Sequence, residues 1–100
     1  MRIAIAAVVL TVSPAWADAI ETCKHAASLA GKVMEARQNG ATIKDVIGPI
    51  LDSTPKESKR LMQSIVMGAF ERPRYATPIN QRNAVADYEN DTFVSCMDAF

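Results

Sequence analysis

Apolar residues recur at helical spacing along most of this chain, and the pattern predicts an all-α protein. Six residues in the first half of the chain return at alternating steps of three and four, which places them on one face of a helix. They are Ile20, Cys23, Ala27, Ala30, Met34 and Arg37. Asn39 and Gly40 follow, and glycine suits the left-handed position that ends a helix. We therefore predict a first helix from about residue 19 to residue 38.

A short second helix is predicted from residue 42 to residue 51, with Thr42 as its N-cap. The apolar residues of this segment are Ile43, Val46, Ile47, Ile50 and Leu51. Gly48 and Pro49 interrupt them, and a proline inside a helix removes a backbone hydrogen bond and clashes with the preceding turn. We expect this pair to kink or split the second helix.

The third helix has the clearest start signal. Thr54 is at the position of an N-cap, and Pro55 is at the position of the first helical residue. Glu57 is where a capping box places its carboxylate. An apolar stripe follows, made of Leu61, Met62, Ile65, Val66, Ala69 and Phe70. The opposite side carries Lys56, Lys59, Arg60 and Gln63. Pro73 ends the pattern near Arg72.

The last helix is predicted from Pro78 to near the C-terminus, because Thr77 and Pro78 repeat the order of a cap followed by a proline. Its candidates for burial are Val85, Tyr88, Thr92, Phe93, Cys96, Met97 and Phe100. Short connections between four helices favour a small bundle with antiparallel neighbours. With Cys23 beside Cys96, an antiparallel register places Ala30 near Tyr88 or Glu89, and Met34 near Val85.

The first 17 residues have the order of a secretory signal peptide. Arg2 supplies the positive start, Ile3 to Val12 supply an apolar run, and Ala15 to Ala17 form a small-residue cleavage site. The run of ten residues is about half the roughly 20 that a helix needs to cross a bilayer. We therefore expect residues 1–17 to be removed, a periplasmic or secreted protein, and no permanent membrane anchor.

The two cysteines, Cys23 and Cys96, lie near the two ends of the expected mature chain, residues 18–100. Export would place them where disulfides form and persist. Such a cross-link matters for a small domain, because closing a loop of this length stabilises the folded state by roughly 4 kcal/mol. The alternatives are two free buried thiols or an intermolecular bridge. We expect a single domain, a four-helix bundle-like fold stapled by this one disulfide.

The charge of the chain is balanced, with 11 basic and 11 acidic side chains. Loss of Arg2 would leave a mature net charge of about −1, since all the carboxylates follow residue 17. A chain without a basic stripe lacks the electrostatic footprint of a nucleic-acid binder. The same balance argues against an anionic membrane surface as the partner.

Candidates for metal binding and catalysis are weak in this sequence. His25 is the only histidine; with Cys23, Cys96 or Glu21 it could be recruited to a metal, but zinc cysteines usually come in close pairs. No serine stands in a known nucleophile motif. The carboxylates of Asp87, Glu89 and Asp91 are two residues apart, so a helix points them to different faces. We predict no catalytic residues, no metal and no cofactor.

The best local candidate for a binding surface is the connection from Glu71 to Tyr75. It joins Arg72 and Arg74 to the aromatic ring of Tyr75, and arginine and tyrosine are typical anchors of protein interfaces. The alternative is a simple linker, in which Tyr75 packs back on the core and both arginines face water.

Two resemblances follow from these features. The signal pattern, Cys23, the helix stop at residues 37–40, the stretch Ile65 to Tyr75 and Cys96 together resemble the short uncharacterised exported proteins common in Gram-negative bacteria. That resemblance implies no activity. The helical plan with two cysteines is also similar in outline to the periplasmic acid-stress chaperones of the HdeA type, but no motif residue is carried over from them.

Three functions remain, and we order them by elimination. The first is a non-enzymatic protein that binds another periplasmic or secreted protein, a class that includes inhibitors and immunity proteins. The second is a holdase chaperone that acid switches on by protonating its carboxylates. The third is a small hydrolase or redox enzyme; the lack of a C-x-x-C motif argues against redox catalysis.

Overall fold

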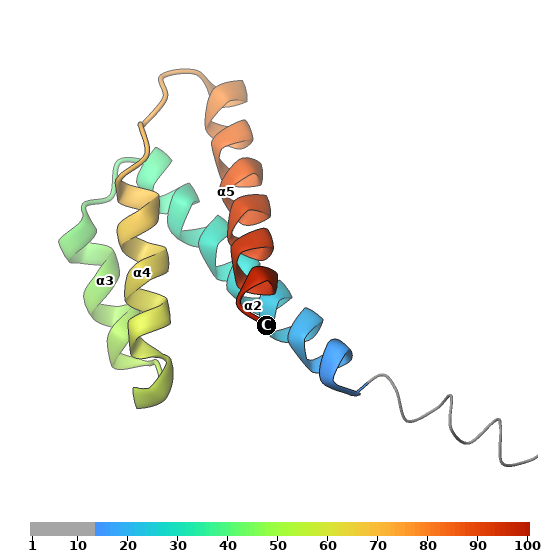
Figure 1. Ribbon diagram of the computed structural model, residues 1–100. Coiled ribbons are helices and arrows are strands. Elements are labelled where there is room, and N and C mark those ends of the chain that lie inside the picture. Colours follow the sequence, from blue (N-terminus) through green and yellow to red (C-terminus); the bar gives the residue numbers. More distant parts are fainter. Residues whose placement is uncertain (1–13) are drawn as a thin grey trace, which may run out of the picture.

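The computed structural model describes residues 14–100, and this part of the chain is helical with no strand (Figure 1). The elements are α2 (Pro14–Gln38), α3 (Ile43–Asp52), the 3-10 turn η1 (Lys56–Ser58), α4 (Lys59–Phe70) and α5 (Pro78–Asp98). The predicted all-α, four-helix fold class is confirmed. Most of the predicted signal peptide, residues 1–13, lies outside the described residues.

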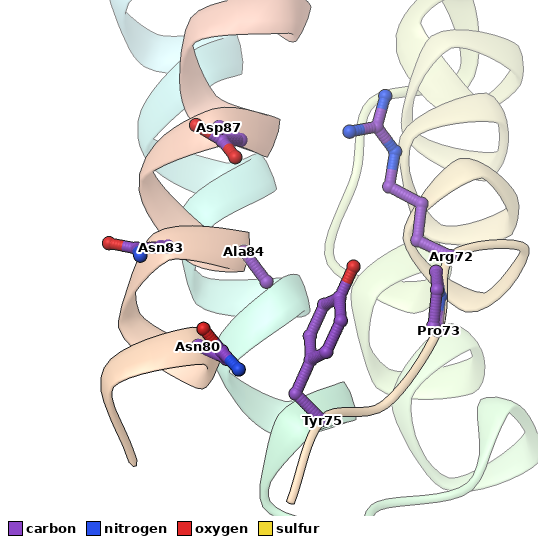
Figure 2. A pocket seen from close by; sticks show the side chains of 7 residues that line it. All are labelled: Arg72, Pro73, Tyr75, Asn80, Asn83, Ala84 and Asp87. Carbon is purple, nitrogen blue, oxygen red and sulfur yellow. The ribbon is translucent and has the colours of Figure 1, made fainter. Parts of the chain in front are cut away.

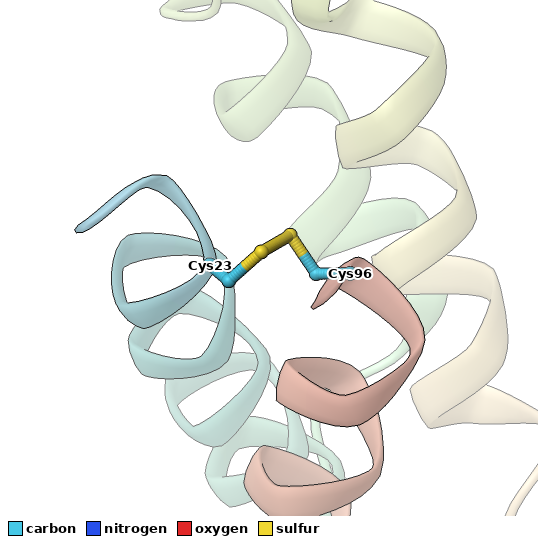
Figure 3. The surroundings of a disulfide bond; sticks show 2 residues. All are labelled: Cys23 and Cys96. Carbon is cyan, nitrogen blue, oxygen red and sulfur yellow. A yellow bond between two sulfur atoms is a disulfide. The ribbon is translucent and has the colours of Figure 1, made fainter. Parts of the chain in front are cut away.

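Helices α2 and α5 pack against each other and are joined by the Cys23–Cys96 disulfide (Figure 3). The two Cα atoms are 5.5 Å apart, and Cys23 is completely buried. Gly31, the residue after Ala30, lies so close to Glu89 that a Cβ atom there would collide with the glutamate carboxylate. The intramolecular disulfide is therefore as predicted, and the approach of Gly31 to Glu89 agrees with the predicted antiparallel register near Ala30.

The hydrophobic core lies where α2, α4 and α5 meet. Its buried members are Ala26, Ala30, Val33, Met34, Ile65, Val66, Ala69 and Tyr88. Helix α3 has no fully buried residue and packs against α4 with half-buried aliphatic side chains. In Figure 1, α2 runs diagonally behind α4 and α5, and α3 lies on the outer side of α4. Helix α2 is thus the element that the other two core helices share.

The first helix begins five residues earlier than predicted, at Pro14 instead of residue 19. A proline is favourable in the first turn of a helix because the missing N–H would have no partner there. The predicted end is confirmed. Gly40 has a φ of 95°, and the bonds from Ala41 N to Ala36 O and from Gly40 N to Arg37 O form a Schellman motif.

The second helix was expected to be kinked or split, and the split is wrong: α3 is a single helix with Pro49 inside it. Proline disfavours the helical conformation in the residue before it because its ring crowds that residue's Cβ. Gly48 has no Cβ, and no neighbouring atom occupies the space where one would lie. The pair therefore lets the helix continue, while Thr42 caps it as predicted by accepting a bond from Asp45 N.

The predicted capping box at the start of the third helix is wrong. Helix α4 begins at Lys59 after the turn η1. The side chain of its N-cap residue, Ser58, makes no capping hydrogen bond. The Thr54 hydroxyl instead donates to Ile50 O at 2.5 Å. Because α3 ends only two residues earlier, at Asp52, its free carbonyl groups compete for that hydroxyl.

Helix α5 begins as predicted, with Thr77 Oγ1 accepting a bond from Asn80 N at 3.4 Å. Burial along it was predicted less well. Of the seven candidates only Tyr88 is buried, five are half-buried, and Phe100 is 72% exposed because the helix ends at Asp98. Leu61 of α4, also predicted to be inside, is 44% exposed. Both exposed side chains flank the same opening between α4 and α5.

A candidate binding groove between α4 and α5

The link between α4 and α5 is fastened to the end of α2 by Gln38, which is 98% buried by its neighbours. Its side-chain oxygen accepts a bond from Tyr75 N at 2.8 Å, and its side-chain nitrogen donates to Pro73 O at 2.9 Å. The backbone oxygen of Gln38 accepts a bond from Arg74 Nε at 3.0 Å. Sequence reasoning missed this residue, since a polar residue in the last turn of a helix carries no signal of burial.

Arg37 makes a second attachment of the link to α2. Its guanidinium donates two bonds to Arg72 O, at 3.3 and 3.2 Å, and lies 5.4 Å above the centre of the Phe70 ring. The start of the link is therefore fixed to the same helix end as its middle. Two independent attachments make this connection an ordered part of the fold.

The three predicted binding residues of the link do not share one surface. Arg72 and Tyr75 line a hollow of about 450 Å³ with Asn80, Asn83 and Asp87 (Figure 2). Arg74 lines a different hollow, beside Gly40 and α4. Tyr75 is 41% exposed and the Arg72 side chain is 39% exposed, so both are partly open to water. Arg72 and Tyr75 therefore lie together while Arg74 lies apart from them, and a binding role for the link stays a prediction.

Arg72 connects α4 to α5 through two contacts. Its guanidinium forms an ion pair with Asp91 at 2.9 Å and lies 4.5 Å above the centre of the Tyr88 ring. The Tyr88 hydroxyl donates to Ile65 O at 2.5 Å, beside Gly68, where a Cβ atom would collide with that hydroxyl. These contacts hold the two helices together near the link.

A second hollow of about 450 Å³ lies between the same two helices, and we name it the α4–α5 groove. Its lining is mainly apolar and comes from three helices and the C-terminus: Thr22, Ala26, Leu61, Ser64, Ile65, Gly68, Arg72, Tyr88, Asp91, Thr92, Ser95, Cys96, Ala99 and Phe100. The Arg72–Asp91 pair closes one end. Leu61 and Phe100 flank the other end, where both are exposed.

Tyr88 gives the closed end of the groove a neutral polar group. Burial raises the pKa of the Tyr88 hydroxyl above its ordinary value, and the positive charge of Arg72 offsets part of that rise. The hydroxyl therefore keeps its proton near neutral pH and uses it in the bond to Ile65 O. It is a structural donor in this arrangement.

The other candidate groups are dispersed. His25 Nε2 lies 3.6 Å from Glu21 Oε2 on the surface of α2, and both side chains are exposed. Asp87, Glu89 and Asp91 line three separate hollows. Within residues 14–100, no three histidine, cysteine, aspartate or glutamate side chains are placed to share a metal ion. The described part of the chain also has no helix with the length and apolar character of a membrane span.

Comparison with known proteins adds no constraint to this geometry. No family model matches the chain, and neither a curated protein nor a solved structure matches it. The chemistry of the α4–α5 groove is therefore the basis on which function is argued.

Proposed function

We propose that this protein is an exported, non-enzymatic binding protein that holds a segment of another protein in the α4–α5 groove. The observation that carries the proposal is an apolar groove that is open in the folded, disulfide-linked chain, with Leu61 and Phe100 exposed beside it. Exposed apolar surface of this kind is typical of binding sites. The signal pattern of residues 1–17 and the disulfide support a periplasmic or secreted location.

The shape of the groove favours an amphipathic helix as its occupant. Helices α4 and α5 form its walls, and Thr22 and Ala26 of α2 contribute to its floor. A helix of the partner could lay its apolar face on Ala26 and Ile65 and leave its polar face in water. The partner helix would then cover the apolar side chains that α4 and α5 leave exposed at this end.

An acid-activated holdase is the competing function, and the groove separates the two. A holdase of that kind hides its apolar surface until protonation near pH 2 or 3 loosens the fold. Here the apolar surface is accessible without loosening, because the groove lies between ordered helices. The structure therefore favours binding near neutral pH.

The proposal is tested with a synthetic amphipathic helix that has a leucine stripe and a glutamine polar face. Its binding to the purified protein is measured by fluorescence anisotropy at pH 7. We expect saturable binding that Leu61→Ser weakens about fivefold, because the partner loses part of a leucine contact. Ile79→Ser is the matched control, since Ile79 is also an exposed aliphatic residue of a helix but does not line the groove.

Equal affinity of the two variants would show that the peptide binds elsewhere and would contradict the groove as the site. Binding that develops only near pH 3, with the disulfide intact, would replace the proposal with the acid-activated holdase. Circular dichroism of each variant checks that the helices are retained.

A further inference from the structure

We infer that the segment held in the α4–α5 groove is a cationic amphipathic helix, with lysine or arginine flanking its apolar stripe. This inference rests on the proposed function and specifies the chemistry of the partner. It follows from the charges that border the groove, which differ in sign from those on the rest of the molecule.

The α5 wall of the groove has an acidic edge. Asp91 lines the groove, and Asp87 and Asp98 stand four residues before it and seven residues after it, which places all three along one side of the helix. All three are exposed. Val94, on the same side of α5, is also exposed, at 51%. A partner helix resting here would meet carboxylates beside an apolar strip.

The α4 wall and the open end do not offset that charge. On the α4 side, the negative charges of Glu57 and Glu71 balance the positive charges of Arg60 and Arg72. Glu57, Arg60 and Glu71 lie one helical turn from groove-lining residues. Arg72 lines the groove and is already paired with Asp91. At the open end, Asp18 lies one turn before Thr22. On α2 the exposed Glu21 directly precedes the groove-lining Thr22 and adds a further carboxylate. The border of the groove is therefore net negative.

Several of the other basic side chains are engaged away from the groove. Lys59 Nζ donates to Leu51 O at 2.7 Å on the α3 side of the molecule, and Arg37 and Arg74 hold the link to the end of α2. The expected mature chain carries a net charge of only about −1, so an acidic border at the groove means a less acidic surface elsewhere. This separation gives the groove an electrostatic preference that the overall composition hides.

A cationic amphipathic helix matches both properties of this site. Its apolar stripe would cover Leu61 and Phe100, and long lysine or arginine side chains would extend from the groove to the carboxylates of Asp87 and Asp98. Complementary charge of this kind raises the association rate and rejects partners of the wrong sign. An anionic helix with the same stripe would place like charges along α5.

The test compares three synthetic helices with one leucine stripe and a polar face of lysine, glutamine or glutamate. Affinities for the purified protein are measured by fluorescence anisotropy at pH 7, at low and high salt. We expect the lysine helix to bind about tenfold more tightly than the glutamine helix at low salt, and the glutamate helix more weakly. The advantage of lysine should shrink at high salt because exposed ion pairs are screened.

Two double variants locate the effect. Asp87→Asn with Asp98→Asn should remove most of the lysine advantage and leave the glutamine helix unchanged. Glu35→Gln with Asp52→Asn makes the same change in net charge at exposed sites on α2 and α3, away from the acidic side of α5, and should preserve the advantage. Asp91 is kept in both variants because it is paired with Arg72.

Equal binding of the three helices, with Leu61→Ser still weakening all of them, would overturn the inference and leave the apolar groove as the binding site. Binding of none of them would remove the proposed function as well. A stable dimer that Leu61→Ser converts to a monomer, seen by light scattering, would assign the groove to a second copy of this chain and would also overturn the inference.

Discussion

At the scale of single residues, Tyr88 decides how closely α4 and α5 approach. Its ring is covered by Arg72, and its hydroxyl reaches Ile65 O past Gly68. Glycine normally weakens a helix interior, but here the lack of a side chain leaves room for the hydroxyl. The sequence pattern identified Tyr88 as a core residue, whereas the need for Gly68 becomes visible only from the partner helix.

Gly68→Ala is expected to destabilise the protein by about 1 kcal/mol or more, because the new methyl group meets a hydroxyl that is held by a buried bond. In a Tyr88→Phe background the hydroxyl is absent, and the same substitution should stabilise the chain by up to about 1 kcal/mol through helix propensity. Urea unfolding of the four proteins measures this double-mutant cycle. Equal effects of Gly68→Ala in both backgrounds would show that the hydroxyl is not what excludes a side chain.

At the scale of elements, the link between α4 and α5 shows how an irregular segment is held in place. Gln38 serves as both donor and acceptor to the backbone of this link and is buried among its neighbours. Gln81 also bonds to the link, donating to Tyr75 O at 2.8 Å, but it does so near the surface. Burial makes the difference, since water can replace an exposed bond and not a buried one.

Gln38→Ala is expected to lower the free energy of unfolding by about 2 kcal/mol, because Tyr75 N and Pro73 O would lose their partners at a partly buried site. Gln81→Ala, which removes an amide bond to the same link, should cost less than about 0.5 kcal/mol. Thermal or urea unfolding compares the two. Similar losses for both variants would mean that burial at Gln38 has no energetic consequence.

At the scale of the whole molecule, α2 supplies one surface for both α4 and α5, and the disulfide fixes its N-terminal half to the end of α5. Helices α4 and α5 both contribute side chains to the core, and the α4–α5 groove lies between them with Leu61 and Phe100 exposed beside it. The disulfide lies beside it, because Cys96 is one of the lining residues.

Replacing both cysteines by alanine is expected to lower the free energy of unfolding by about 4 kcal/mol, since the bond joins residues 73 positions apart and restricts the unfolded chain. Urea unfolding of the variant and of the oxidised protein measures the loss. Intact mass with and without reductant provides the control, because one internal disulfide adds two hydrogens on reduction. A stability unchanged by the substitution would show that packing of α2 on α5 is sufficient without the bond.

The sequence by itself determined most of the local structure. Helical periodicity, Gly40 as a left-handed stop, and the caps at Thr42 and Thr77 depend on neighbours within a few residues, so they were predicted correctly. Two cysteines left only one internal pairing, and this also fixed the register of α2 on α5. The exception was Thr54, where two helix ends compete for a single hydroxyl.

Only the tertiary structure decided the burial of Gln38, the pairing of Arg72 with Asp91 and the existence of the α4–α5 groove. A periodic stripe shows which face of a helix is apolar, but it does not show whether another helix covers that face along its whole length. Leu61 and Phe100 continue apolar stripes and remain exposed because no other helix covers them. The angle between packed helices depends on side chains far apart in the chain, so it is set by the fold as a whole.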